Sequence, residues 1–286
     1  MPTITAKTKI LGVIGHPIEH SMSPIMHNTA INDLKLDYVY LAFDIEPQDL
    51  SKAIDGIRAL NIKGISVTIP HKEAIMEYLD EIEPIAKNIG AVNTIKNKNG
   101  YLKARNTDGA GGKQSLIENG CELSDKKVLF IGAGGAARAL SYFLAEDVAQ
   151  IIFLNIRKER SKLLAKELNE KTGVKTFADS ISNKNLKKFC STSDILINAS
   201  PIGMYPKIEE TPVPKEFLHK NLFVFDIIYN PLKTKLLKNA EDIGCKTLGG
   251  LDMLVNQGFL AFEWWTEKTP KKELMRNTVK KFLGIK

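Results

Sequence analysis

A strand that runs directly into a glycine-rich turn and a helix is the feature that most constrains the fold. The apolar run Val128-Leu129-Phe130-Ile131 predicts a buried strand, and Gly132-Ala133-Gly134-Gly135-Ala136-Ala137 follows it without a break. Glycines let the backbone approach a pyrophosphate, and the helix N-terminus presents unpaired N–H groups to it. Ala137 stands at the third-glycine position, which the dinucleotide fingerprint permits. The alternative is a structural tight turn, but the surrounding strand and helix favour a dinucleotide site made by Gly132, Ala133, Gly134, Gly135 and Ala136.

The rest of the chain alternates between short apolar runs and amphipathic stretches. Strands are predicted at 9–15, 38–43, 64–69, 92–96, 101–105, 127–131, 150–155, 194–199 and 222–225. Helices are predicted at 24–34 and 47–60, twice between 72 and 89, from Asp108 to 118, and twice after Leu251. Asn99-Gly100 predicts a hairpin turn between two of the strands. This alternation indicates an α/β protein with largely parallel sheets and helices on both faces.

Bulk composition excludes several classes of protein. The 286 residues are 43% hydrophobic and 26% charged, which is typical of about two globular domains. No run approaches the roughly 18 apolar residues of a membrane helix, and the N-terminus lacks the apolar core of a signal peptide, so we expect a cytoplasmic protein. The net charge of +7 is spread along the chain between acidic residues. It suits nucleic acid, a polyanionic cofactor or an acidic metabolite, so the charge alone does not decide between them.

The cysteines and histidines do not indicate a metal. Cys121, Cys190 and Cys245 are far apart and form no CxxC pair, so we expect reduced, structural thiols. The five histidines do not cluster with cysteine or with one another at ligand spacing, and no metal site is predicted.

The strand that follows the glycine turn indicates which nicotinamide cofactor binds. It ends at Asn155, where an acidic residue would hold the free ribose hydroxyl of NAD. Ile156 follows, and the three cations Arg157, Lys158 and Arg160 lie just beyond. Cations at this point accommodate a 2′-phosphate, so NADP is favoured over NAD. The alternative is an ordinary basic first turn of a surface helix.

Two polar segments in the first half of the chain predict a substrate site. Val67-Thr68-Ile69-Pro70-His71-Lys72 predicts a strand leading into a helix that opens with Lys72, where the helix dipole disfavours a cation unless it has a function. Asn106-Thr107-Asp108-Gly109 places a carboxylate at the start of the next helix. Taken singly, Lys72 could be a solvated surface lysine and Asp108 a helix cap.

The N-terminus of the first helix is predicted at Ser21-Met22-Ser23-Pro24. Ser23 is the expected N-cap and Pro24 the first helical residue. Two hydroxyls beside free N–H groups also make a good carboxylate site, which we favour over capping alone.

With these motifs in order, the chain resembles the shikimate dehydrogenases of the shikimate/quinate dehydrogenase family along nearly its whole length. Besides the segments above, the resemblance includes Gly15-His16-Pro17, Gly90-Ala91-Val92-Asn93-Thr94, Asn198-Ala199-Ser200-Pro201-Ile202-Gly203-Met204, Asp226-Ile227-Ile228-Tyr229-Asn230-Pro231 and Met253-Leu254-Val255-Asn256-Gln257. It implies reduction of 3-dehydroshikimate to shikimate with NADPH, in the pathway to aromatic amino acids.

The resemblance also implies roles for individual residues. Lys72 and Asp108 correspond to the catalytic pair, and Ser21 and Ser23 bind the substrate carboxylate. Thr68, Asn93, Gln257 and Tyr229 complete the substrate site, and Met253 joins the cofactor residues. A positioned cation suits this chemistry, because hydride transfer to a carbonyl leaves an alkoxide that needs a proton.

Three positions depart from the family pattern. Ser66 stands where asparagine is common, so a polar contact there is expected to be shortened or lost. Asn155-Ile156-Arg157 replaces the usual Asn-Arg-Thr, which displaces the expected arginine by one position. Ser200 replaces a common threonine.

The implied architecture is a substrate domain, 1–108 with 251–286, and a Rossmann-like, doubly wound NADP-binding domain, 109–250. Rival hypotheses are a broader quinate/shikimate dehydrogenase that uses NAD or NADP, and a non-catalytic NADP-binding sensor. Nucleic-acid binding is the weakest alternative, because no basic-aromatic surface pattern is present. A small-molecule substrate is therefore expected, with no nucleic-acid or membrane partner, in a monomer or homodimer.

Overall fold

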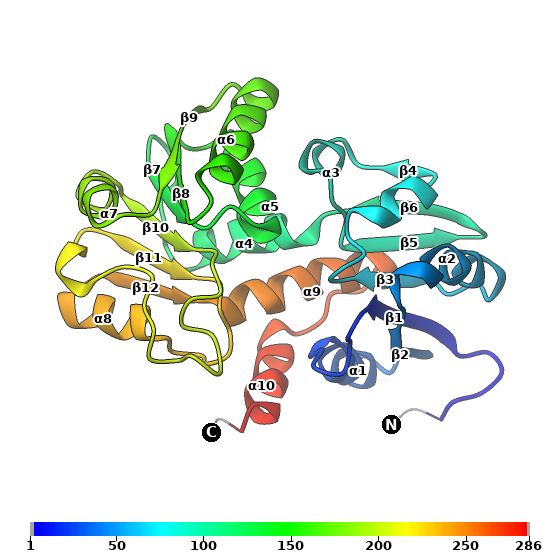
Figure 1. Ribbon diagram of the computed structural model, residues 1–286. Coiled ribbons are helices and arrows are strands. Elements are labelled where there is room, and N and C mark those ends of the chain that lie inside the picture. Colours follow the sequence, from blue (N-terminus) through cyan, green and yellow to red (C-terminus); the bar gives the residue numbers. More distant parts are fainter. Residues whose placement is uncertain (1–2, 285–286) are drawn as a thin grey trace. The chain divides into compact units, whose positions relative to one another are not determined.

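The computed structural model describes residues 3–284 and divides the chain into two compact units. One unit contains the chain up to Thr107 together with the residues from Val255 onward, and the other runs from Asp108 to Leu254. The two divisions fall inside helices α4 (Thr107–Glu118) and α9 (Gly250–Thr266). We call the unit that contains the chain up to Thr107 the first unit, and the unit from Asp108 to Leu254 the second unit. Figure 1 labels the helices and strands of both.

The first unit is built on a mixed six-stranded sheet. Its order is β2 (Tyr38–Asp44), β1 (Lys9–Gly15), β3 (Gly64–Val67), β5 (Thr94–Lys98), β6 (Tyr101–Arg105) and β4 (Glu81–Ile82). β1 pairs parallel with β2 and β3, whereas β5 is antiparallel to β3 and β6. The predicted hairpin is confirmed: Asn99 and Gly100 both have positive φ, 55° and 89°, as a tight two-residue turn requires.

Helices cover both faces of this sheet. α1 (Ser23–Asp33) and α2 (Leu50–Ala59) lie on opposite faces, as Figure 1 shows. α2 buries Ile54 and Ile57 in one apolar cluster with Ile65 and Ile95 of the sheet. On the α1 side, Gly258 of α9 lies against Met26, where an added Cβ would come within 2.3 Å of the methionine Cε. The unit also contains α3 (Pro84–Ile89), α10 (Lys272–Phe282) and two 3₁₀ helices, η1 (Pro47–Asp49) and η2 (Ala74–Tyr78).

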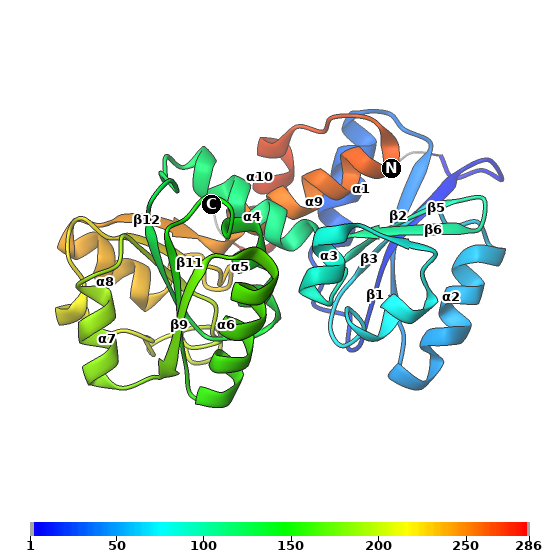
Figure 2. The ribbon, with the colours of Figure 1, turned by 90° about the horizontal axis from the view of Figure 1, so that it is seen from above.

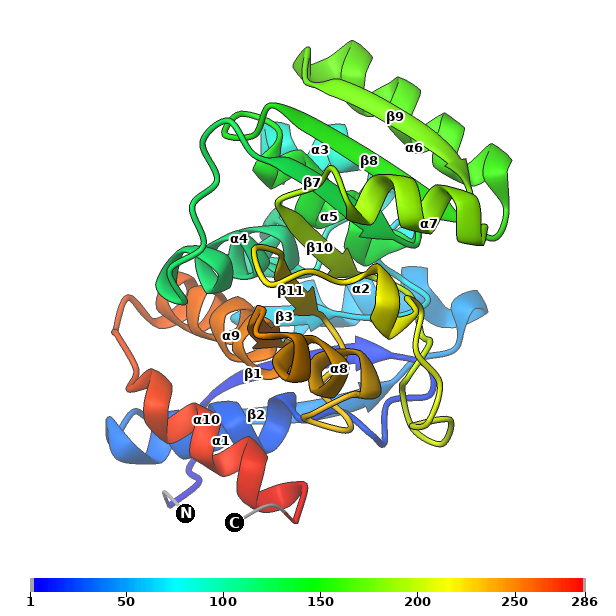
Figure 3. The same ribbon diagram turned by 90° about the vertical axis from the view of Figure 1, so that its left-hand side faces the viewer.

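The second unit is a doubly wound parallel sheet. Its order is β12 (Lys246–Gly249), β11 (Phe223–Asp226), β10 (Ile195–Asn198), β7 (Lys127–Ile131), β8 (Gln150–Asn155) and β9 (Lys175–Ser180), and every pair is parallel (Figure 3). Helices α5 (Gly135–Leu144) and α6 (Lys158–Thr172) cover one face, and α7 (Asn183–Cys190) and α8 (Lys235–Ile243) cover the other (Figure 2). The strand order reverses between β7 and β10, which is the Rossmann arrangement expected from the sequence.

The structure contains strands that the hydrophobic pattern did not predict. β9 is an edge strand whose residues are largely half-buried or exposed, so it lacks a continuous apolar run. β4 has two residues and β12 has four, and both lie at sheet edges. Edge strands need fewer apolar residues because one side has no neighbouring strand. The helix pair predicted after Leu251 is confirmed as α9 and α10.

Cysteine placement agrees with the expectation of structural thiols. Cys121, Cys190 and Cys245 are free and buried, and burial raises the pKa of Cys190 to about 12.

Across residues 3–284, no group of three or more histidine, cysteine or acidic side chains could hold a metal ion. No helix in that same range is long and apolar enough to cross a membrane.

One glycine sets how closely α4 packs against α5 in the second unit. A Cβ added to Gly109 would lie 2.5 Å from the carbonyl oxygen of Ala139 and 2.3 Å from Cδ2 of Phe143. A backbone carbonyl inside a helix cannot move aside without disturbing the helix. Gly109 therefore allows α4 to lie directly on α5, and this contact fixes the start of α4.

We predict that Gly109→Ala destabilises the protein by roughly 2–3 kcal/mol, because the methyl group overpacks a rigid contact. Gly56→Ala is the matched control: Gly56 lies inside α2 with no atom within 4 Å of an added Cβ. This control should stabilise by about 0.5–1 kcal/mol, since alanine is the better helix former. Urea denaturation measures both, and a Gly109→Ala variant as stable as wild type would contradict the α4–α5 packing.

Candidate active site

Ser21 and Ser23 lie where the chain enters α1. The helix begins at Ser23, its N-cap position is Met22, and no side chain caps it. The hydroxyl of Ser21 instead accepts a 3.3 Å hydrogen bond from the backbone N–H of Ser23. The prediction that Ser23 is the N-cap is therefore wrong: Ser23 is already helical, and its hydroxyl is not used to cap the helix. Both serines are half-buried.

Thr68 and Lys72 follow the end of β3. The N–H of Thr68 donates to the carbonyl of Ile14 (2.9 Å). The Thr68 methyl group covers Gly15 so closely that a Cβ there would lie 2.4 Å away. Lys72 lies in a turn before η2, which begins at Ala74, so the predicted helix opening with Lys72 is wrong. The carbonyl of Lys72 accepts from the N–H of Val92 (2.9 Å), which fixes its backbone beside the segment that leads to β5.

The buried side chain of Asn93 joins the segment before β5 to the start of α4. Its Oδ1 accepts the N–H of Thr107 (2.7 Å), and its Nδ2 donates to the Thr107 hydroxyl (3.0 Å). Only 3% of Asn93 is exposed, and the hydroxyl of Thr94 also donates to its Oδ1 (3.1 Å). Thr107 is the first residue of α4, so Asn93 satisfies an N–H that the helix start would otherwise leave unpaired. Asp108 follows in the first turn, where the dipole favours a carboxylate.

The predicted substrate and catalytic residues divide between the two units. The first unit holds Ser21, Ser23, Thr68, Lys72, Asn93 and Gln257, and the second holds Asp108 and Tyr229. Gln257 is a half-buried residue of α9, next to the glycine that packs on Met26. Tyr229 follows β11, and burial raises the pKa of its hydroxyl. Lys72 and Asp108, the expected catalytic pair, thus belong to different units.

The glycine turn of the second unit has the geometry that a dinucleotide needs. Gly132 has a φ of 106° and lies so close to β10 that a Cβ would come within 2.7 Å of the carbonyl oxygen of Ala199. Gly134 is the N-cap of α5 and Gly135 its first residue. An added Cβ on either would have no protein atom within 4 Å, so both backbones face open space. Ala137 is fully buried, as the close helix–sheet position of the fingerprint requires.

Ala133 and Ala136, the two alanines predicted to line this turn, are half-buried. The open backbone at Gly134 and Gly135, together with the N-terminus of α5, forms an anion cradle, which fits the pyrophosphate of a dinucleotide.

The loop after β8 carries the predicted cofactor-selecting residues. The side chain of Asn155 donates from Nδ2 to the carbonyl of Arg157 (2.9 Å), which shapes the turn into α6. Arg157 is the exposed N-cap residue of α6, and Arg160 is also exposed. Lys158 forms a 2.6 Å ion pair with Asp179 of β9. The structure therefore divides the three predicted cations into one paired lysine and two exposed arginines.

Met253, the remaining predicted cofactor residue, lies on α9 and is buried. Its sulfur would be 3.4 Å from a Cβ on Gly112 of α4, a position that also faces Leu140 of α5. Met253 therefore lies against α4, the helix that carries Asp108.

Sequence reasoning did not single out the buried network centred on Asp226. The Nδ2 of Asn198 donates to its Oδ1 (3.0 Å), and the Thr234 hydroxyl donates to its Oδ2 (2.7 Å). Asn198 in turn accepts from the hydroxyl of Ser200 (2.7 Å). The network joins the carboxyl ends of β10 and β11 and so supports the loops that carry Ser200 and Tyr229. Both Asn198 and Asp226 stand inside recognised motifs, which was the available signal.

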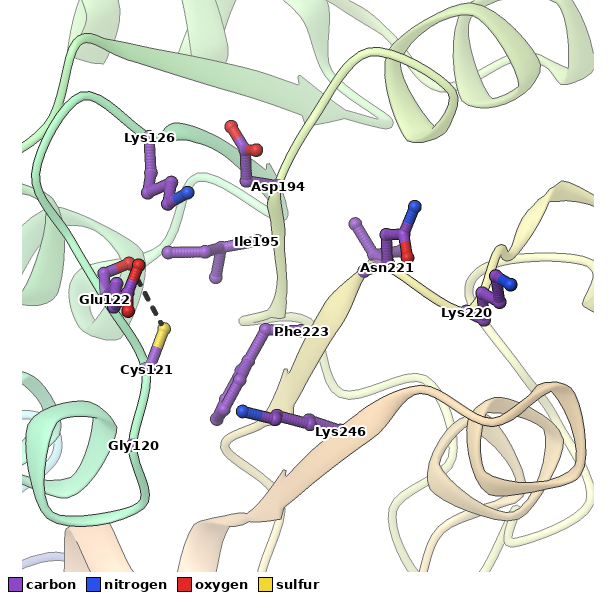
Figure 4. A pocket seen from close by; sticks show the side chains of 11 residues that line it. Gly120, Cys121, Glu122, Lys126, Asp194, Ile195, Lys220, Asn221, Phe223 and Lys246 are labelled. Atoms are coloured by element: carbon purple, nitrogen blue, oxygen red, sulfur yellow. Dashed lines mark hydrogen bonds between the residues drawn. The ribbon is translucent and has the colours of Figure 1, made fainter.

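A cavity of about 350 Å³ lies at the opposite edge of the same sheet. Figure 4 shows its walls, which include Lys126, Lys220 and Lys246 together with Glu122 and Asp194. These residues precede or begin β7, β10, β11 and β12, whereas the glycine turn lies beyond the other ends of the strands. None of the predicted site residues lines this cavity, so it is not the predicted site.

Together, these features define a class of protein. A Rossmann sheet has a glycine turn at the point where strand order reverses, and the other α/β unit carries the predicted hydroxyl, amide and lysine side chains. This combination is typical of a two-domain oxidoreductase that uses a nicotinamide dinucleotide.

Comparison with protein families identifies the particular family. Residues 13–95 match the family described as shikimate dehydrogenase substrate binding domain. Residues 114–232 match shikimate / quinate 5-dehydrogenase, and residues 250–280 match the shikimate 5′-dehydrogenase C-terminal domain. The chain belongs to the shikimate/quinate dehydrogenase family.

Individual relatives match over nearly the full length. A shikimate dehydrogenase (NADP(+)) of Methanocaldococcus jannaschii is 50% identical over 277 residues, 96% of this chain and 98% of the relative. A crystal structure of a shikimate dehydrogenase in complex with NADP+ is 48% identical, with a TM-score of 0.92 and 98% of both chains covered. The structure of the Listeria monocytogenes shikimate 5-dehydrogenase with shikimate and NAD is 38% identical, also with a TM-score of 0.92, covering 98% of this chain and 99% of that one.

We predict that Asp226 makes stability fall as pH rises. Burial raises the pKa of this carboxyl from 3.8 to about 6, despite the hydrogen bonds it accepts. A raised folded-state pKa gives stability that is complete below pH 3.8 and is lost as pH rises through 6. The free energy of unfolding of wild type relative to Asp226→Asn should therefore drop by about 3 kcal/mol between pH 3.5 and pH 7.

Urea denaturation at several pH values measures this difference. Asp242→Asn is the control, because Lys215 lowers the pKa of that exposed carboxyl and its contribution has the opposite sign. A pH-independent difference between wild type and Asp226→Asn would show that the pKa of Asp226 is the same in the folded and unfolded states, and would contradict the prediction.

Proposed function

We propose that this protein catalyses the reversible, NADPH-dependent reduction of 3-dehydroshikimate to shikimate, a step in aromatic amino-acid biosynthesis. The observation that carries the proposal is the nearly end-to-end similarity to the shikimate dehydrogenase (NADP(+)) of Methanocaldococcus jannaschii. The open phosphate cradle at Gly134 and Gly135 supports it independently, because it supplies the cofactor site that the reaction needs.

In this proposal a substrate domain, residues 1–108 with 251–286, binds the substrate, and residues 109–250 bind NADP. Ser21 and Ser23 hold the substrate carboxylate at the N-terminus of α1, where hydroxyls and helix N–H groups favour an anion. The ring hydroxyls and carbonyl contact the remaining substrate residues: Thr68, Lys72, Asn93, Asp108, Tyr229 and Gln257.

The proposed chemistry divides between cofactor and protein. NADPH supplies the hydride that reduces the carbonyl carbon. Lys72 donates a proton to the carbonyl oxygen, so that the developing alkoxide becomes a hydroxyl group, and its charge stabilises that oxygen in the transition state. Asp108 orients the Lys72 ammonium and accepts a hydrogen bond from the adjacent substrate hydroxyl. In the reverse direction Lys72 accepts the proton of the substrate hydroxyl.

The loop after β8 supports NADP as the cofactor. β8 ends in Asn155, so no carboxylate stands there to repel a 2′-phosphate. Arg157 and Arg160 are exposed beside the loop, and a guanidinium can hold phosphate through two hydrogen bonds. Lys158 contributes less in this proposal, because Asp179 already pairs with it. The remaining cofactor contacts are Gly132, Ala133, Gly134, Gly135, Ala136, Asn155 and Met253.

A broader quinate/shikimate dehydrogenase is the second candidate function. The Listeria relative was solved with NAD, and the arginine of this loop is displaced to position 157. Ser66 also replaces the usual asparagine near the substrate. A non-catalytic NADP sensor is less favoured, since it would need neither Lys72 nor Asp108. We further propose that the enzyme acts in the cytoplasm, as a monomer or homodimer, on a small molecule rather than nucleic acid.

We expect the purified protein to reduce NADP+ when shikimate is the substrate. The absorbance of the reduced nicotinamide measures this reaction. We also expect the protein to prefer shikimate to quinate and NADP+ to NAD+. Each preference should exceed about tenfold in kcat/KM, the difference that one charged hydrogen bond provides. Comparable rates with quinate or NAD+ would favour the broader enzyme. Binding of NADPH without turnover on any of these substrates would favour the sensor and refute the proposed reaction.

We predict that Lys72→Ala lowers kcat by roughly 10²–10⁴-fold while the KM for shikimate changes much less, because the proton donor acts mainly in the transition state. Lys87→Ala, which removes an exposed lysine of α3 in the same unit, is the matched control and should retain wild-type kinetics. Near-normal turnover of Lys72→Ala would exclude this residue as the proton donor.

A further inference from the structure

The cavity at the amino ends of the second unit's strands is built from four separate segments of the chain. Its walls are the loop between α4 and β7, the starts of β10 and β12, and the turn that leads into β11. All four segments belong to the second unit. A volume of about 350 Å³ lies within the range of ligand pockets, which begins at roughly 300 Å³. The cavity is therefore large enough for a small metabolite.

Strand register places the residues of the cavity floor in one row. Ile195 of β10 pairs with Phe223 of β11, and Phe223 pairs with Lys246 of β12. Residues that pair directly across strands point to the same face of a sheet. That face is the one away from α7 and α8, because the alternate residues Leu196 and Val224 pack in one apolar cluster with those helices. The floor of the cavity is thus set by the sheet itself.

Packing and hydrogen bonds close this floor. Ile195 is 1% exposed and Phe223 is 7% exposed. Asp194 joins β10 to both neighbouring strands: its Oδ2 accepts the N–H of Lys127 (2.8 Å), and its carbonyl accepts the N–H of Phe223 (2.9 Å). The cavity therefore has a rigid floor, and a preformed site avoids the cost of ordering its walls when a ligand binds.

Three lysines in the walls form no ion pair. Lys126, Lys220 and Lys246 come from different segments, and across residues 3–284 none of their ammonium groups is paired with a carboxylate. Other lysines of the same unit do form such pairs, among them Lys113, Lys158, Lys215 and Lys233. The positive charge at the cavity is thus available to a ligand.

Lys126 and Lys246 approach the same part of the cavity. Figure 4 shows them on opposite sides of Ile195 and Phe223. Burial raises the pKa of the Cys121 thiol to about 12, and the charges of both lysines oppose this shift. The thiol is therefore neutral and does not compensate the two positive charges. Two unpaired ammonium groups in one concave site attract an anion.

A phosphate group suits two lysines that approach from opposite sides. A phosphate monoester carries a charge of about −1.5 to −2 near pH 7 and has three terminal oxygens that accept hydrogen bonds. It can bond both ammonium groups at once, and lysine is a common phosphate ligand. A carboxylate has less charge and one oxygen fewer. Asn221, which also lines the cavity, supplies an amide for a hydroxyl group of the ester.

We propose that this cavity is a second anion site, which binds a small organic phosphate between Lys126 and Lys246, with Lys220 adding to the positive charge of the walls. The site lies at the amino end of β7, whereas the glycine turn follows the carboxyl end of the same strand. The inference goes beyond the proposed reaction and does not depend on it.

Isothermal titration calorimetry with glycerol 3-phosphate tests the proposal. NADP+ is kept at a saturating concentration, so that the glycine turn is not available to the phosphate. The wild-type protein should bind glycerol 3-phosphate with a Kd of about 1 mM or below, since two charge-assisted hydrogen bonds suffice for this affinity. Glycerol, which lacks the phosphate, should not bind. No binding of glycerol 3-phosphate, or equal binding of glycerol, would overturn the proposal.

Single lysine variants locate the site. Lys126→Met and Lys246→Met should each weaken binding roughly tenfold, because each removes one charge-assisted hydrogen bond. Lys127→Met is the matched control, since Lys127 is exposed and adjacent in the chain but does not line the cavity. Its affinity should stay within about twofold of wild type, because solvent and salt screen a distant charge. Equal losses in all three variants, or no loss in any, would refute a site between Lys126 and Lys246.

Glu122→Gln tests the site in the opposite direction. Glu122 is an exposed carboxylate of the walls, and its charge repels an anion in the cavity. Its neutralisation should strengthen the binding of glycerol 3-phosphate about threefold, which a poorly folded variant cannot do. Unchanged or weaker binding would contradict the position assigned to the phosphate.

The binding measurements keep this inference apart from the proposed function. If the protein neither binds NADP+ nor oxidises shikimate, the proposed function fails, and the same variants titrated without NADP+ still test the cavity. If the protein oxidises shikimate but does not bind glycerol 3-phosphate, the inference alone is wrong.

Discussion

In each unit, backbone hydrogen bonds between parallel strands bring the carboxyl ends of those strands to one edge of a sheet. In the second unit, Asn155 ends such a strand and Gly132, Ser200 and Tyr229 follow the ends of others, although these residues are spread over a long stretch of chain. Thr68 follows the parallel strand β3 of the first unit in the same way. The constraint leaves few places for a site, because only these edges gather chain ends from distant parts of the sequence.

Buried polar side chains then fix the loops that the strands deliver. Asn93 holds the first N–H of α4, and Asp226 ties together the segments that follow β10 and β11. Each network fixes the backbone next to a predicted site residue: Asn93 bonds Thr107, which precedes Asp108, and Asp226 ends the strand that leads to Tyr229. A buried polar group is costly unless it is satisfied, so these networks have little freedom to shift. They give loop residues the rigidity that hydride and proton transfer require.

Prediction from sequence succeeded where a local pattern was strong. The strands at 9–15, 127–131 and 150–155 agree with β1, β7 and β8 residue for residue, because each is a central strand with an apolar run. It failed at β9 and β12, where edge strands need few apolar residues, and at Lys72. Near Lys72 the chain forms a turn and a 3₁₀ helix, since the N–H of His71 bonds back to Thr68 instead of starting an α-helix.

The sequence by itself determined the family, the α/β class and the set of candidate functional side chains. Motifs such as Gly132–Ala137 and Asn106–Gly109 could be recognised because their residues are adjacent in the chain. Only the tertiary structure decided how Ser66 is used. Tyr40 and Ser66 are 26 positions apart, and their hydrogen bond exists because β2 and β3 both pair with β1. The structure likewise separated Lys158, paired with Asp179, from the exposed Arg157. Such contacts depend on strand register, which no local pattern encodes.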